Sequence, residues 1–66
     1  MNTSTEHGWL TLYRGYLALD LENDTAAAHR RSSEAKAIAR TLNLFDLEVL
    51  AVALEGLALV RGGEDS

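Results

Sequence analysis

The stretch that decides the fold runs from Asp46 to Arg61 and reads DLEVLAVALEGLALVR. Between its two charged ends only Glu48, Glu55 and one glycine interrupt the apolar side chains. A helix that is apolar nearly all round has to be covered nearly all round. The two glutamates lie seven residues apart, so on a helix they form one narrow stripe, which we expect to face solvent. The stretch is too short and too acidic to span a membrane, so it predicts a central helix packed on at least two sides.

The length of the chain limits the core that it can build. Sixty-six residues make one domain, 1–66, and domains of this size usually need disulfides, a metal ion or oligomerisation as well. The chain has no cysteine and only two histidines, so we expect no disulfide, no metal site and no other cofactor. Oligomerisation or a protein partner remains as the source of additional stability.

The charge of the chain bears on its partners and its location. Its net charge is −4, which argues against nucleic acid and against anionic membranes as binding partners. Residues 1–7 are polar and acidic and do not form a signal peptide, so we expect a cytoplasmic protein. The chain contains no proline and is rich in alanine and leucine, which indicates an all-α protein.

Apolar residues at helical spacing predict three helices, over about 5–21, 25–42 and 46–61. They give an αα-hairpin followed by a third helix. We expect the ends of the chain, 1–4 and 62–66, to be flexible.

Short polar signals mark the predicted helix ends. Thr3 and Glu6 are spaced as a capping box for the first helix, and Asp24 is a suitable N-cap for the second. Asn43 tolerates the left-handed conformation that ends a helix, and Gly62-Gly63 is expected to end the third.

The second helix has a stripe of mostly small residues and an opposite side rich in cations. We expect it to pack antiparallel against both other helices, because short connections make neighbours antiparallel. The buried stripe is predicted to consist of Ala28, Ala35, Ile38, Ala39 and Leu42. The cations opposite it are expected to pair with acids of the other helices.

The first and third helices resemble each other at an offset of 41 residues. The offset matches Gly15 with Gly56 and Trp9 with Leu50, each within a similar apolar segment. It also matches Asp24 with Asp65, so Asp65 should cap a fourth helix that this chain does not contain. The sequence therefore reads as about one and a half units of a helical-hairpin array.

Four segments carry a resemblance to a known family: 8–19, 26–28, 34–40 and 46–60. Together they resemble tetratricopeptide-type repeats, in the long-period form found in large LuxR-type and MalT-like bacterial transcriptional regulators. The offset of 41 exceeds the standard 34-residue repeat. The nucleotide-binding loop and the DNA-binding domain of such regulators have no counterpart here. The resemblance therefore implies a scaffold role, as a protein-interaction part of a regulator, and leaves open whether the chain is a piece of a longer one.

The alternative hypothesis is a small DNA-binding regulator with a helix-turn-helix that uses residues 35–55. The spacing of Ala39, Asn43 and Val49 roughly fits such a motif. Its recognition helix would present Asp46 and Glu48 to DNA, whereas affinity for DNA comes largely from cations. We therefore favour the interaction module over the DNA-binding regulator.

We expect no enzymatic activity. Glu48 and Glu55 lie two helical turns apart, about 10 Å by rise, and therefore do not form a catalytic carboxylate pair. Ser32 and Ser33 have no histidine partner at a position typical of a nucleophile and its base.

We expect the third helix to pair with its own copy in a homodimer, or to receive the helix of another protein in place of the absent fourth. The interface is predicted to include six residues: Trp9, Tyr13, Tyr16, Leu50, Leu54 and Leu57. The aromatic residues among them could instead form a ligand platform, although packing is the reading that we favour.

Overall fold

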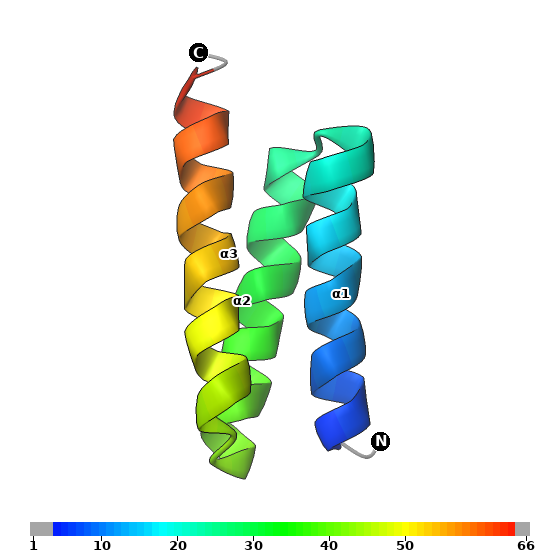
Figure 1. Ribbon diagram of the computed structural model, residues 1–66, viewed down its shortest axis with the longest axis vertical. Helices are drawn as coiled ribbons and strands as arrows, with labels where there is room; N and C mark the ends of the chain where they lie inside the picture. Colours follow the sequence, from blue (N-terminus) through cyan, green and yellow to red (C-terminus); the bar gives the residue numbers. More distant parts are fainter. Residues whose placement is uncertain (1–3, 65–66) are drawn as a thin grey trace.

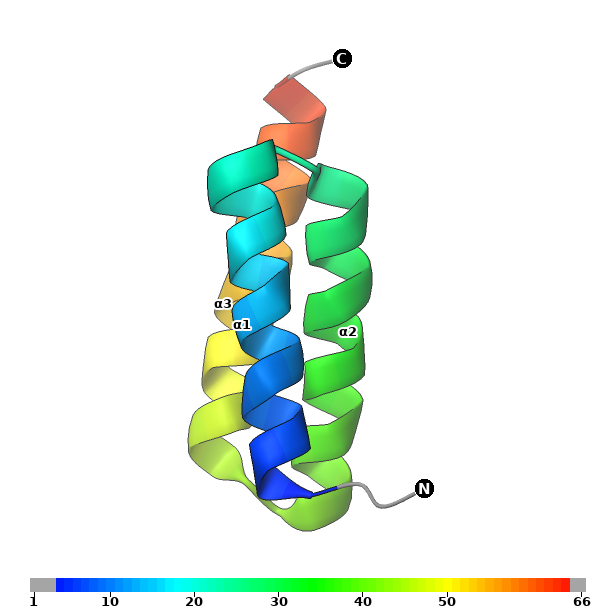
Figure 2. The same cartoon turned by 90° about the vertical axis from the view of Figure 1, so that its right-hand side faces the viewer.

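The computed structural model describes residues 4–64, which form three α-helices. They are α1 (Thr5–Glu22), α2 (Thr25–Leu42) and α3 (Phe45–Glu64). α2 lies against both other helices and antiparallel to them, so that α1 and α3 run in the same direction (Figures 1 and 2). The predicted all-α fold, an αα-hairpin plus a third helix, is confirmed. Within the described part of the chain, no helix is long and apolar enough to cross a membrane.

Side-chain caps begin the first two helices. The Ser4 side chain accepts a hydrogen bond from the backbone N of His7 at 3.1 Å, so Ser4 caps α1. The capping box predicted for Thr3 falls outside the described residues. Asp24 caps α2, as predicted, with its Oδ1 accepting from the backbone N of Ala27 at 3.0 Å.

Asparagines in the left-handed conformation end α1 and α2. Asn43 ends α2 with φ 58°, as expected, and Asn23 ends α1 in the same way with φ 51°. Both residues tolerate this conformation better than most non-glycine residues.

The third helix differs from its prediction at both ends. It begins at Phe45 rather than Asp46, and it continues through Gly62-Gly63 to Glu64. The prediction that these glycines end the helix is wrong, because glycine permits a left-handed turn without forcing one. A Cβ built on Gly62 would lie 3.4 Å from Thr25 Oγ1, so the last turn of α3 packs on the start of α2.

The buried residues recur at four- and three-residue spacing, as in a narrow helix–helix seam. Buried positions of α1 are Gly8, Thr11, Gly15, Ala18 and Leu19, those of α2 are Ala28, Ser32, Ala35 and Ala39, and those of α3 are Leu47, Ala51, Leu54 and Ala58. Three of the five predicted stripe residues of α2 are therefore buried, whereas Ile38 and Leu42 are half-buried. Ser32 was missed; its hydroxyl donates to the backbone O of His29, so it packs as a small residue.

Two glycines let α1 lie close to its neighbours. A Cβ on Gly8 would come within 2.6 Å of Leu47 Cδ2. On Gly15 it would come within 2.9 Å of Arg31 Cβ and 3.2 Å of Leu54 Cδ2. Leu47 and Leu54 of α3 thus reach into the space that these two glycines leave on α1.

Candidate functional site: an apolar groove between α1 and α3

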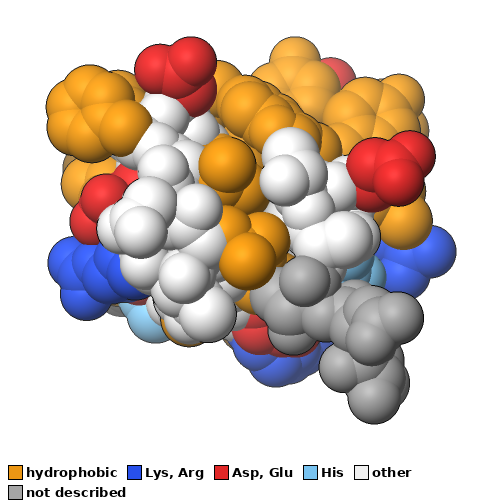
Figure 3. All heavy atoms as spheres, turned by 90° about the horizontal axis from the view of Figure 1, so that it is seen from below, with side chains coloured by type: hydrophobic (Ala, Val, Ile, Leu, Met, Phe, Trp, Pro, Cys, Tyr) orange, Lys and Arg blue, Asp and Glu red, His pale blue; other side chains and the backbone are white. Residues whose placement is uncertain are grey.

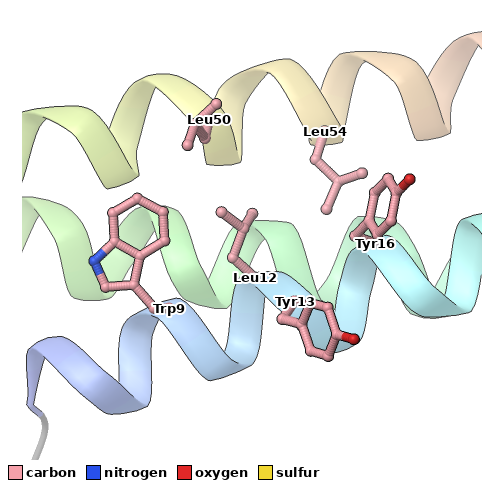
Figure 4. Close-up of a pocket in the computed structure, with 6 residues that line it drawn as sticks. All are labelled: Trp9, Leu12, Tyr13, Tyr16, Leu50 and Leu54. Carbon is pink, nitrogen blue, oxygen red and sulfur yellow. The ribbon is translucent and has the colours of Figure 1, made fainter.

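An apolar groove of about 370 Å³ runs along the side of the molecule where α1 and α3 lie next to each other. α1 contributes Trp9, Leu12, Tyr13 and Tyr16, and α3 contributes Leu50 and Leu54. Figure 4 shows the side chains of the two helices bordering the same space, with α2 behind them. We refer to these six residues as the groove.

The structure brings five of the six predicted interface residues into this groove. Trp9 and Tyr16 are 38% and 50% exposed, so a large part of each ring is available to a binding partner. Leu57 does not line the groove, although it is 43% exposed nearby on α3. Leu12 was missed, although it lies three residues after Trp9 and four before Tyr16, which is the spacing of one helix face.

Leu54, one of the predicted interface residues, is not left exposed in the single chain as an interface residue would be. Leu54 is only 7% exposed and packs with Leu19, Ala28 and Ala58 in the core. It lies on the same helix face as Leu47, Ala51 and Ala58, which are all directed at the other helices. Leu54 therefore forms the floor of the groove and belongs to the fold itself.

A second apolar surface adjoins the groove on α3. We call it the outer face of α3, and it consists of six exposed residues: Val49, Leu50, Ala53, Gly56, Leu57 and Val60. No charged residue interrupts this face between Val49 and Val60. A Cβ built on Gly56 would have no atom within 4 Å, so none of the described residues covers the middle of the face. α3 is thus covered on one side only, where the sequence predicted at least two.

The opposite side of α3 faces α2 through a polar cluster. Lys36 Nζ donates to Glu55 Oε1 at 2.9 Å, and Ser33 Oγ donates to Glu55 Oε2 at 2.7 Å. His29 Nε2 lies 3.6 Å from the same carboxylate oxygen. The two hydrogen bonds hold the pKa of the Glu55 carboxyl below its usual value, and the bond from Lys36 has the larger effect. Burial acts in the opposite direction.

The prediction that Glu48 and Glu55 form a stripe facing solvent is therefore wrong. Glu55 lies in the polar cluster, and Glu48 Oε2 accepts a hydrogen bond from Arg40 Nε at 2.9 Å. Both carboxylates turn toward α2 because that helix carries the cations that pair with them. The predicted pairing of charges between helices is confirmed, and the two pairs help fix α2 and α3 in register.

The chemistry of the polar cluster favours a structural role. A general base works best with a pKa near the working pH, whereas Lys36 and Ser33 lower that of Glu55. The carboxylate is thus a poor acceptor for the proton of the Ser33 hydroxyl. Among residues 4–64, no group of three or more His, Cys, Asp or Glu side chains could hold a metal ion.

Apolar and basic side chains occupy different sides of the molecule. In Figure 3 the hydrophobic side chains gather along the upper edge, where α1 and α3 lie, and the Lys and Arg side chains lie in the lower half. α2 carries four of the six cations and a single acid, Glu34. A partner approaching the groove and the outer face of α3 would meet an apolar surface.

The chain matches no known protein family, no curated protein sequence and no solved structure.

Proposed function

We propose that this protein is a non-enzymatic protein-interaction and oligomerisation module. In this proposal it has the scaffold of a tetratricopeptide-type repeat, of the kind found in bacterial transcriptional regulators. It associates with a second copy of itself through its apolar side, formed by the groove and the outer face of α3.

The observation that carries this proposal is the contrast between two matched faces of α1 and α3. Gly15 of α1 packs closely against α2 and α3, whereas its counterpart 41 residues later, Gly56, has open space around it. Leu19 is 2% exposed, whereas its counterpart Val60 is 61% exposed. Within residues 4–64, the face that neighbouring helices cover on α1 is thus uncovered on α3, as expected of a repeat face that packs against a further neighbour.

The energetics of the chain support the same proposal. Large contiguous apolar surfaces are uncommon on soluble monomers and usually mark an interaction site. The core is small, since its largest fully buried side chains are Leu19, Leu47 and Ser32. A chain of this size gains stability when association buries further apolar surface.

The geometry of residues 35–55 does not favour the helix-turn-helix alternative. In that motif the second helix crosses the first at about 90–120°. Here α2 and α3 lie antiparallel along their length (Figure 1). Arg40, the cation nearest the turn, is also engaged by Glu48.

Light scattering at tens of micromolar tests the proposal. We expect the wild-type protein to have at least twice the mass of a 7.2 kDa chain. Leu57→Glu places a charge on the outer face of α3 and should shift the protein to monomer while its helix content is retained. Ala37→Glu is the matched control, because Ala37 is exposed on α2, away from the apolar side. A folded wild-type protein that remains at 7.2 kDa would refute the proposal.

A further inference from the structure

We propose that two copies of the chain pair through antiparallel α3 helices, outer face against outer face, about a two-fold axis that passes close to Ala53. The pairing rests on the proposed function and adds to it the partner helix, its direction and its register. A two-fold dimer is the commonest closed assembly, in which one surface meets itself.

Two opposite charges at the two ends of α3 define the direction of the pairing. Asp46 is exposed in the first turn of α3, and Arg61 lies in its last turns. Among the described side chains, those of residues 4–63, neither Asp46 nor Arg61 takes part in an ion pair, in contrast to Glu48 and Glu55 on the same helix. They are 15 residues apart, about 22 Å along the helix, so they cannot pair with each other in one chain.

The antiparallel arrangement brings these charges together. Asp46 and Arg61 lie equally far on either side of the point between residues 53 and 54. A two-fold axis there places Asp46 of one copy opposite Arg61 of the other, and the symmetry repeats the pair at the far end. A parallel arrangement would instead place each charge opposite its own like charge, which opposes association.

The apolar residues obey the same symmetry. Leu50 and Leu57 are also equally far from this point, so each packs against the other in the partner helix. They are 48% and 43% exposed in the single chain, which leaves surface to bury on pairing. Ala53 and Gly56, near the axis, are small enough to let the two helices approach closely.

The distribution of charge favours a second copy over a partner of another kind. The outer face of α3 carries no charge, so two copies with net charge −4 meet there without placing like charges in contact. The cations of α2 lie on the other side of the molecule, away from the outer face of α3 (Figure 3). Leu50 belongs to both the outer face and the groove, so the partner helix would rest along the rim of the groove.

Charge reversal tests the register. Asp46→Arg and Arg61→Asp each place like charges together at both ends of the dimer, because the two-fold symmetry doubles each substitution. We expect each to raise the dissociation constant, measured by sedimentation equilibrium, by about tenfold. The double variant Asp46→Arg/Arg61→Asp restores two opposite-charge pairs and should return the constant to near the wild-type value.

The double variant also separates the interface from effects on the helix. Each reversal is unfavourable to the helix dipole, and the double variant keeps both costs, so its recovery could come only from pairing between chains. Glu6→Arg, a reversal in the first turn of α1, is the control and should leave the constant unchanged. A wild-type dimer that the single reversals do not weaken, or that the double reversal does not restore, would overturn the register and leave the proposed function standing. A wild-type monomer would overturn both.

Discussion

Gly15→Ala and Gly56→Ala form a matched pair of substitutions. Together they test whether neighbouring helices cover one face of α1 and leave the equivalent face of α3 uncovered. Both glycines lie in helix interiors at equivalent places, so alanine should gain about 1 kcal/mol of helix propensity at each. At Gly56 the new methyl meets open space, and we expect the free energy of unfolding to rise by up to about that amount.

At Gly15 the same methyl meets atoms that cannot easily move. It would lie 2.9 Å from Arg31 Cβ and 3.2 Å from Leu54 Cδ2, and a Cβ moves only with its backbone. Such overpacking costs about 1–3 kcal/mol. After the gain in propensity, we expect Gly15→Ala to be neutral to about 2 kcal/mol destabilising, and the two variants to differ by about 1–3 kcal/mol.

Urea unfolding followed by circular dichroism measures this difference. For a chain of this size a slope of about 1 kcal/mol per molar urea applies, so the two midpoints should lie about 1 M or more apart. The comparison is made at the lowest protein concentration that gives a signal, where association contributes least. A Gly15→Ala midpoint as high as that of Gly56→Ala would refute the close packing of α1.

Three further substitutions probe the core and the polar cluster. Ala35→Leu should cost about 1–3 kcal/mol in urea unfolding, because Ala35 is fully buried between helices, and an unchanged midpoint would mean that it faces no close neighbour. Leu54→Glu places a charge in the core and should unfold the chain at a cost of about 3 kcal/mol or more, whereas a folded Leu54→Glu monomer would restore the view that Leu54 belongs only to an interface. Because the folded pKa of Glu55 is lowered, its contribution to stability is full above the ordinary carboxyl pKa and is lost as the pH falls through the folded pKa. Thermal unfolding between pH 7 and pH 3 should therefore show a smaller loss of stability for Glu55→Gln than for wild type, and equal losses would contradict the role of the cluster.

The helices and their boundaries could be predicted largely because their signals are local. Asp24 and Asn43 act through bonds to residues a few positions away, and such signals can be read without knowing the fold. The end of α3 could not be predicted in this way. The helix continues through Gly62, where a Cβ would lie 3.4 Å from Thr25 Oγ1 at the start of α2, and this proximity joins residues distant in the sequence.

The orientation of α3 could not be predicted from its own pattern. Apolar residues surround it, so periodicity alone did not say which side meets α2. The cations of α2 decide this, since Lys36 and Arg40 draw Glu55 and Glu48 toward them and thereby bury Leu54. Five of the six predicted interface residues nevertheless border the groove, because large apolar side chains on one side of α1 have to border either the core or an interface. Their binding to a partner stays a prediction.

Disulfide formation between single cysteines measures most directly whether the outer faces of two α3 helices meet. The chain has no cysteine of its own, so Ala53→Cys provides one thiol beside the proposed two-fold axis. Ala37 is exposed as well, so Ala37→Cys places an accessible thiol on α2, away from the apolar side. A disulfide requires the two Cα atoms to lie within about 7 Å of each other. In a glutathione buffer at tens of micromolar protein, we expect Ala53→Cys to become mostly disulfide-linked dimer while Ala37→Cys stays mostly monomeric. Equal, low cross-linking of the two variants would contradict the pairing of the outer faces.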